Sequence, residues 1–199
     1  MSAFPGSPIL VSKPPGATFV RIYDSRYYGD GAAFRFFGPH QHGRFDHHPA
    51  GPAVRHLHHG VLYLAADLPC AVAETYGDAR LVAPTPTQRL AVVALTRVVR
   101  LADTRGRAAV ELGVPAGALR TRDRPLTQRV ARDLYAETSA DGILYEGWFT
   151  GGTCVALWER ARYAVDLVDD RALTDPAVAA DLLVIADELH YAAGEIGPF

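Results

Sequence analysis

Short stretches of β-branched and aromatic residues alternate with helical patterns along this chain of 199 residues. The segment ATFVRIYD, residues 17–24, is expected to form the first strand, because it is rich in residues that favour extended structure. Residues 153–161 fit either a strand or a helix. Further strands are expected at 61–66, at 89–103 (one or two strands), at 141–148 and at 163–170.

Three segments carry helix signals. Asp67 is suited to be an N-cap, Pro69 fits the first turn, and the helix is expected to close near Gly77. Residues 125–138 place Leu126, Val130 and Leu134 four positions apart, which predicts an amphipathic helix. A last helix is expected to open at Thr174–Asp175–Pro176 and to run to about Ala193, with Gly194 as its stop.

The segments that lack such patterns divide the chain. Residues 1–16 contain prolines and glycines before any regular pattern and are expected to form an N-terminal arm, followed by one domain over 17–199. Residues 29–60 are punctuated by Gly, Pro and His with little periodicity, and long loops of this kind are often functional. Strands and helices are mixed without regular βαβ alternation, so the fold class is α+β, with mixed sheets flanked by helices.

Composition narrows the class of protein. Hydrophobic residues make up 49 % of the chain and the formal charge is −2, so nothing marks the surface as a binder of nucleic acid or of anionic membranes. Cys70 and Cys154 lie in apolar segments and are expected to be buried free thiols. The chain has neither a basic leader followed by an apolar run nor an apolar stretch of the ~20 residues that a membrane span needs. A soluble, cytoplasmic protein without a membrane partner is therefore expected.

Glu74 is the first candidate for chemistry. It falls in the middle of a small, Ala-rich predicted helix, where a carboxylate either faces solvent or points into a cleft, and the periodicity leaves both open. In the preceding predicted strand, Tyr63 and Ala65 share one face while Leu62 and Leu64 share the other.

Taken together, the segments RIY, GRFD, VLYLAADLPCAVAE and DGILYEGWFTGGTCVALWE resemble the RES-domain family, the toxin half of Xre–RES toxin–antitoxin systems in bacteria. The resemblance runs from about Phe19 to Val168 and depends on the order and spacing of these segments. It implies a fold similar to that of ADP-ribosyltransferase toxins. It also implies cleavage of the nicotinamide–ribose bond of NAD, with ADP-ribose passed to water, phosphate or a protein, and neutralisation by an Xre-type antitoxin.

The resemblance also implies roles for particular residues. The two family arginines correspond to Arg21 and Arg44, which are expected to hold the pyrophosphate of NAD, because a guanidinium can bond two phosphate oxygens at once. Tyr63 corresponds to the tyrosine that orients nicotinamide by a cation–π contact. Glu74 corresponds to the acidic residue, which would stabilise an oxocarbenium-like sugar. The expected substrate-binding residues are Tyr63, Tyr23, Tyr145 and Gly147.

The chain departs from the family pattern at one position. The family serine corresponds to Gly147, and Thr150, Thr153 and Glu146 are nearby but not aligned with it. This departure leaves open a catalytically weak or inactive relative that acts as a nucleotide-binding or antitoxin-binding module. A homodimer is also left open.

Seven of the eight histidines lie between His40 and His59. A metal ion needs three or four converging ligands, and spacings of one residue or none rarely converge without help from a distant element. No metal is therefore expected, and a polar loop around Arg44 is the favoured interpretation; a metal hydrolase built on this loop is the alternative. The basic run Arg120–Arg129 is expected to be a solvated face or a docking surface for an acidic partner.

Overall fold

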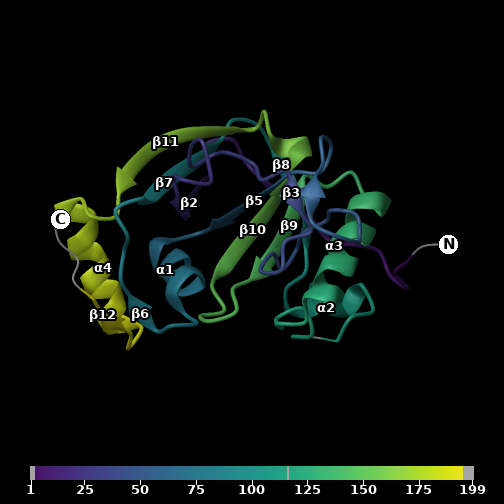
Figure 1. Cartoon of the computed structure of the whole chain (residues 1–199). Coiled ribbons are helices and arrows are strands. Elements are labelled where there is room, and N and C mark those ends of the chain that lie inside the picture. The colour runs from purple at the N-terminus through teal and green to yellow at the C-terminus, as the bar shows by residue number, and fades with distance from the viewer. Residues whose placement is uncertain (1–2, 116, 195–199) are drawn as a thin grey trace.

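An eight-stranded, curved sheet forms the centre of the computed structural model, which describes residues 3–115 and 117–194 (Figure 1). The strand order is β1-β8-β9-β10-β5-β2-β7-β11. Its strands are β1 (Leu10–Lys13), β2 (Thr18–Asp24), β5 (Val61–Ala65), β7 (Gln88–Leu95), β8 (Val99–Asp103), β9 (Gly142–Glu146), β10 (Thr153–Trp158) and β11 (Val165–Ala172). Two small sheets pair β3 (Phe37–Gly38) with β4 (Val54–Arg55), and β6 (Leu81–Val82) with β12 (Ala192–Ala193).

Helices cover one side and both ends of this sheet. They are α1 (Leu68–Tyr76), α2 (Gly106–Glu111), α3 (Arg124–Glu137), α4 (Pro176–Glu188) and the short 3₁₀ helix η1 (Glu159–Ala161). In Figure 1, α4 stands at one end of the molecule and α2 and α3 stand at the other, with α1 between them. Within the central sheet, β8 and β9 are parallel neighbours, so the chain must cross over between them, and α2 and α3 lie in that connection. The fold is a mixed α+β domain, as expected from the sequence.

Side-chain alternation on β5 separates two parts of the core. Leu62 and Leu64 pack into one cluster, whereas Val61 and Ala65, with Tyr63 beside them, pack into the cluster beneath α1 and α3. This is the arrangement that the sequence predicts, and it places the Tyr63 ring on the same side of the sheet as α1.

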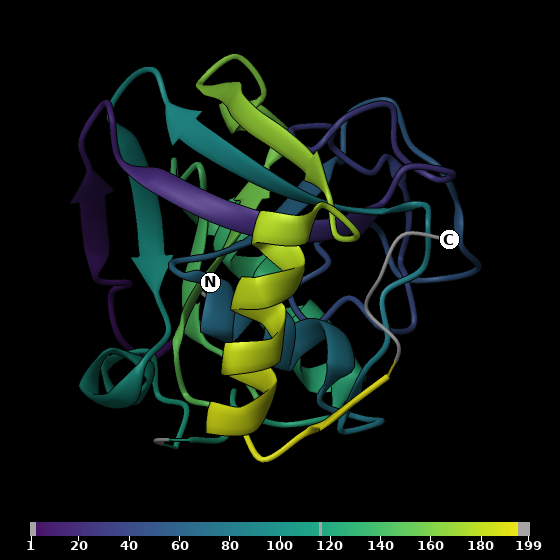
Figure 2. The same ribbon diagram turned by 90° about the vertical axis from the view of Figure 1, so that its left-hand side faces the viewer.

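Helix α1 is held from two sides. Its N-cap is Asp67, whose carboxylate accepts from the backbone N–H of Cys70, and Gly77 ends it, both as predicted. Val72 and Tyr76 join residues of α4 in a third buried cluster, while Ala71 and Cys70 pack toward the sheet. Figure 2, with α4 in front, shows how this last helix runs across that end of the molecule. Helix α1 therefore packs against the sheet on one side and against α4 on another. This packing fixes the position of a side chain on the side that remains.

Two boundaries differ from those predicted. Within the expected N-terminal arm, residues 10–13 form β1 and pair with the otherwise open edge of β8, so part of the arm belongs to the sheet. The last helix ends at Glu188 rather than near Ala193. His190 adopts a left-handed φ of 55°, which ends the helical path, and the following residues pair with β6.

Two ambiguous segments are now resolved. Residues 89–103 contain two strands, β7 and β8, and residues 153–161 contain the strand β10 followed by η1. Within the described residues, no helix is long and apolar enough to cross a membrane.

Asp141 lies just before β9, and its side chain bonds residues at the turn between β7 and β8. Its carboxylate accepts from the guanidinium of Arg97 at 2.8 and 3.2 Å and from the backbone N–H of Arg100 at 2.9 Å. Burial opposes ionisation of this carboxyl, but the hydrogen bonds from Arg97 and Arg100 outweigh it and lower the pKa below the ordinary value of 3.8. The ionised form therefore stabilises the fold above about pH 3.8, and this contribution is lost as the pH falls below that value.

The Asp141→Asn variant should lose about 1–3 kcal/mol of unfolding free energy at pH 7, because hydrogen bonds to a charged group are lost. Its unfolding free energy should also fall less steeply than that of the wild type as the pH drops below 4. Urea denaturation at several pH values measures both effects. Asp166→Asn, at an exposed position, is the control and should leave the profile of the wild type unchanged. Parallel pH profiles for Asp141→Asn and the wild type would contradict the assignment.

Candidate functional site

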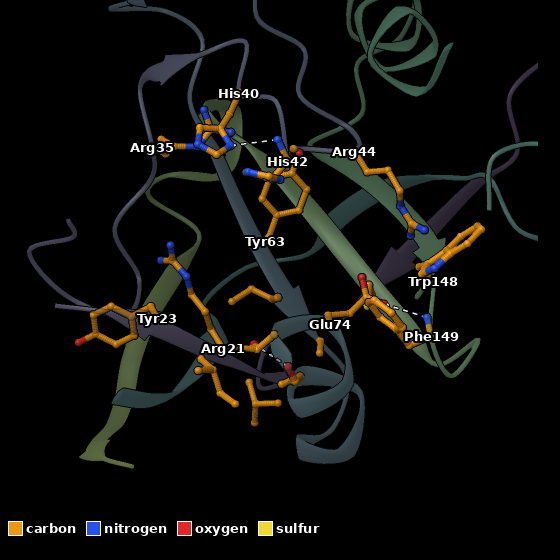
Figure 3. A pocket seen from close by; sticks show the side chains of 18 of the residues that line it. Arg21, Tyr23, Arg35, His40, His42, Arg44, Tyr63, Glu74, Trp148 and Phe149 are labelled. Carbon is orange, nitrogen blue, oxygen red and sulfur yellow. Dashed lines mark hydrogen bonds between the residues drawn. The ribbon is translucent and has the colours of Figure 1, made fainter. Parts of the chain in front are cut away.

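A cavity of about 540 Å³ opens beside α1 on the face of the sheet that carries Tyr63 (Figure 3). Its volume lies in the range of ligand-binding pockets, roughly 300–1,000 Å³. The walls come from β2, β5, α1, the segment around Arg44, the start of α3 and the turn after β9. Six of the seven residues that the sequence nominates line it: Arg21, Tyr23, Arg44, Tyr63, Glu74 and Tyr145.

Arg21 projects from the middle of β2 and is 9 % exposed. One of its nitrogens, Nη1, donates to the backbone carbonyls of Gly31 and Ala33, at 3.2 and 3.0 Å. Its guanidinium also lies over the ring of Tyr28, with 4.1 Å between the central carbon and the ring centroid. Burial lowers the pKa of Arg21, and the positive charge of Arg35 acts in the same direction. These contacts fix the guanidinium but provide no carboxylate partner.

Arg44 is 5 % exposed and belongs to the long segment between β2 and β5. Its Nη2 donates to the backbone carbonyl of Glu146, and its guanidinium lies over the ring of Tyr145 at 4.8 Å. Its Nη1 is buried and has no hydrogen-bond partner among the residues that the structure describes. An unsatisfied buried donor is costly, so a ligand that supplies an acceptor would be favoured here.

The two arginines lie on opposite sides of the cavity, with Tyr63 and Glu74 between them (Figure 3). Arg35 is the charged neighbour of Arg21, whereas Arg124 is the charged neighbour of Arg44. The cavity therefore has two basic ends rather than a single clamp formed by Arg21 and Arg44.

Tyr63 holds the segment that carries Arg44. Its hydroxyl oxygen accepts from the backbone N–H of Phe45 at 3.1 Å. Burial is the main cause that raises the pKa of Tyr63 above its ordinary value, and the nearby carboxylate of Asp46 adds to it. The ring lies between the two basic ends of the cavity. Tyr63 therefore lines the cavity and also fixes the segment that carries Arg44.

Glu74 points from α1 into the cavity, which resolves the choice between solvent and cleft. Its Oε1 accepts from the backbone N–H of Phe149 at 3.4 Å. Gly147 does not line the cavity but lies directly behind this carboxylate. A Cβ atom at position 147 would stand 3.0 Å from Oε1 of Glu74 and 3.3 Å from the sulfur of Cys70. A larger side chain there would therefore press on the carboxylate.

Tyr23 and Tyr145, the other two tyrosines nominated from the sequence, are already engaged by neighbouring residues. Tyr23 is 5 % exposed, and its hydroxyl donates to a carboxylate oxygen of Asp170 at 2.6 Å, so this polar end is occupied. Burial raises the pKa of Tyr23 to about 12. Tyr145 is buried beneath Arg44 and stacks against Phe45, with 4.7 Å between ring centroids. It supports the guanidinium of Arg44 from below.

Sequence reasoning missed several residues of the cavity wall, namely Arg35, Arg122, Arg124, Trp148 and Phe149. Arg122 and Arg124 belong to the basic run that was expected to be a solvated face or a docking surface. Arg120, Arg122 and Arg129 are exposed, as a solvated face requires, but Arg122 also lines the rim of the cavity and Arg124, at the start of α3, is a partly buried part of its wall. The signal in the sequence was the placement of this run at a helix start, where basic side chains are unfavourable unless they serve another purpose.

Electrostatics favour an anionic ligand. Of the five arginines in the wall, Arg35 pairs with Asp46 and Arg122 pairs with Asp78. No ion pair joins Arg21, Arg44 or Arg124 to a carboxylate within residues 3–115 and 117–194. Burial and the charge of Arg44 lower the pKa of Arg124, so these two guanidiniums repel one another. An anion between them would relieve this repulsion.

The histidine-rich segment divides into two groups. His40 and His42 line the cavity, whereas His47 and His48 are buried behind it. Asp46, His47 and His48 each offer a ligand atom, and these atoms lie within 4.8 Å of one another. These three consecutive residues therefore bring their ligand atoms together despite their close spacing. A distant element does help: Glu159, after β10, contacts His47.

Both cysteines are buried free thiols, as predicted. The sulfur atoms of Cys70 on α1 and Cys154 on β10 lie 3.3 Å apart, at the floor of the cavity behind Glu74.

Gln128 on α3 anchors the cavity segment that precedes Arg44. Its side-chain nitrogen donates to the carbonyls of His40 and Gly43, at 3.0 and 2.9 Å. The Gln128→Glu variant places an oxygen against these carbonyls, so the loss of both bonds should cost about 1–3 kcal/mol locally. Amide hydrogen exchange at residues 40–44 should then be roughly 10- to 100-fold faster.

Arg129→Gln is the matched control, because it makes the same change in net charge at an exposed position one residue away. Its exchange at residues 40–44 should equal that of the wild type. Unchanged exchange in Gln128→Glu would show that the loop does not depend on this anchor.

Comparisons with known proteins agree with this fold. No curated protein matches the chain at a significant level. A chain in the crystal structure of the M. tuberculosis MbcT–MbcA toxin–antitoxin complex is similar in fold, with a TM-score of 0.59 and 19 % identity, covering 87 % of this chain and 92 % of that one. The family model described as the RES domain matches residues 18–179, which include every residue of the cavity wall. This chain therefore belongs to the RES domain family.

Proposed function

We propose that this chain is the toxin of a toxin–antitoxin pair and that it cleaves the nicotinamide–ribose bond of NAD. The observation that carries the proposal is the cavity itself, where three arginines that have no carboxylate partner in the described part of the chain face the same space as Glu74. A dinucleotide carries a doubly charged pyrophosphate next to a ribose, and the cavity offers basic groups next to a carboxylate. Membership of the RES domain family and the fold shared with a chain of a toxin–antitoxin complex support the same conclusion.

Arg44 and Arg124 are assigned to the pyrophosphate. They lie close enough for their charges to interact, and Nη1 of Arg44 has an unused donor. Planar guanidiniums suit the bidentate geometry of phosphate oxygens. Arg21 then faces the opposite end of the dinucleotide, where its guanidinium is fixed by the carbonyls of Gly31 and Ala33. Sequence analysis assigns the pyrophosphate to Arg21 and Arg44 together. In this proposal Arg44 keeps that role, and Arg21 contacts the other end of the dinucleotide.

Glu74 is assigned to the ribose of nicotinamide. When the bond between the ribose carbon and the ring nitrogen breaks, the electron pair leaves with nicotinamide, which becomes neutral, and positive charge develops on the sugar. A fixed carboxylate stabilises that charge, and α1 holds Glu74 in place through packing on both of its faces. Tyr63, between Glu74 and the far wall, provides an aromatic face for the departing ring. Water, phosphate or a protein side chain then attacks the sugar carbon.

A second candidate function rests on Gly147. A Cβ atom at this position would stand 3.0 Å from the carboxylate of Glu74, so the family serine would place its side chain against the proposed catalytic group, and glycine does not. The alternative is therefore a chain that binds the nucleotide, or only its antitoxin, without turnover. The partner in either case is a protein of the Xre type that covers the cavity.

Purified protein incubated with NAD should release nicotinamide, measured by chromatography, and the second product should identify the acceptor as water or, when phosphate is added, as phosphate.

Glu74→Gln should lower kcat by roughly 10²- to 10³-fold with little change in NAD affinity, because it removes a charge that acts mainly in the transition state. Arg124→Gln should instead weaken NAD binding by at least about tenfold in calorimetry. Arg129→Gln serves again as the control with the same charge change.

Wild-type protein that binds NAD in calorimetry but releases no nicotinamide, with or without phosphate, would favour the second candidate. Absence of both binding and release would refute the NAD assignment altogether.

A further inference from the structure

Four imidazoles that are separated along the chain meet behind the cavity wall. His47 and His48 follow Asp46, His56 follows β4, and His59 precedes β5. We call these four residues the histidine cluster. Neighbouring ring centroids lie 5.7 Å apart for His47–His48, 5.3 Å for His48–His56, 5.7 Å for His56–His59 and 5.3 Å for His47–His59. His48 and His59, across the middle, are 6.2 Å apart.

The two inner imidazoles are each tied to a carboxylate through one nitrogen only. Nδ1 of His48 bonds a carboxylate oxygen of Asp46, and Nε2 of His47 bonds Oε2 of Glu159 at 2.9 Å. The other nitrogens, Nε2 of His48 and Nδ1 of His47, are buried and have no hydrogen-bond partner within the described residues. His47 is 1 % exposed and His48 is fully buried, so water does not readily satisfy these atoms.

This pattern is typical of histidines that bind metal ions. A ligating imidazole commonly donates its second N–H to a carboxylate, which fixes the tautomer and leaves a lone pair on the other nitrogen for the metal. Asp46 acts in this outer position rather than as a ligand. Its oxygens are already engaged by His48, by the guanidinium of Arg35 at 2.8 Å and by the backbone N–H of His40 at 2.7 Å.

Five of the six separations between rings in the histidine cluster are close to those of tetrahedral coordination. Four imidazoles bound to one ion at Zn–N distances of ~2.1 Å have ring centroids about 5.2 Å apart. The observed separations are 5.3–6.2 Å. His56 and His59 are partly buried, and each would turn one nitrogen inward to complete the shell around the ion.

We propose that the histidine cluster is a structural zinc site, with Nδ1 of His47, Nε2 of His48 and one nitrogen each from His56 and His59 as ligands. Four imidazoles fill a tetrahedral shell and leave no open position for a reacting water, so the site is structural rather than catalytic. The ion would lock His56 and His59, at the end of the long segment, to His47 and His48 near its middle.

The site would act on the cavity through Asp46. This carboxylate joins His48 to Arg35 and to the backbone of His40, and both of these residues line the cavity. A bound ion would therefore stiffen the wall that carries Arg44. The proposal stands independently of NAD cleavage, because it rests on the geometry of the histidine cluster alone.

The test uses full-length protein produced without a histidine tag. After dialysis against zinc-free buffer, elemental analysis should find about one zinc per chain. Replacement by cobalt(II) should give the intense visible absorption of a tetrahedral site. His56→Ala and His59→Ala should each weaken zinc binding by at least roughly tenfold, and zinc should raise Tm less in these variants than in the wild type.

His58→Ala is the matched control, because His58 lies in the same segment but is exposed and outside the histidine cluster. It should retain the zinc content, the cobalt spectrum and the Tm shift of the wild type. Circular dichroism establishes that each variant is folded. Neither zinc nor a tetrahedral cobalt spectrum in the wild type, or an equal loss in His58→Ala and His59→Ala, would overturn the proposal.

Discussion

One buried carboxylate, that of Asp46, joins more parts of the segment between β2 and β5 than any other contact described above. This segment has few strand or helix hydrogen bonds, so side chains must fix its path. A buried charge is tolerated only when it is fully paired, and Asp46, which is completely buried, meets Arg35, His48 and the backbone of His40. Burial opposes its ionisation, but these partners prevail and lower its pKa. The carboxylate therefore holds the cavity wall to the histidine cluster.

The cavity thus has two walls of different character. Arg21 and Glu74 stand on a central strand and on a helix packed on both faces, so their positions are set by the hydrophobic core. Arg44 stands on a segment held by polar contacts, including those of Tyr63 and Gln128. Polar contacts break and reform more readily than core packing does. The side of the cavity that carries Arg44 is therefore held by polar contacts, and the side that carries Glu74 is held by the core.

Local patterns in the sequence were sufficient to predict the strand and the helix that carry Tyr63 and Glu74. The alternation in VLYLAA placed Tyr63 correctly, and the cap at Asp67 fixed the register of α1. The direction of Glu74 could not be predicted, because an Ala-rich helix has no clear apolar face. Arg124 was missed because its place in the wall depends on how α3 is oriented, which is a property of the crossover between β8 and β9. The same limit explains why the convergence of the histidines was not predicted. It involves Glu159, which lies more than one hundred positions after His47.

The order of strands in the sheet has a consequence for how the protein is made. Strand β5, which carries Tyr63, lies between β2 and β10, and β10 is translated more than eighty residues later. A nascent chain still attached to the ribosome therefore lacks one neighbour of its central strand, together with Tyr145 and the turn that contacts Glu74. The cavity is completed only when nearly the whole domain has been synthesised, so incomplete translation products contain no finished site.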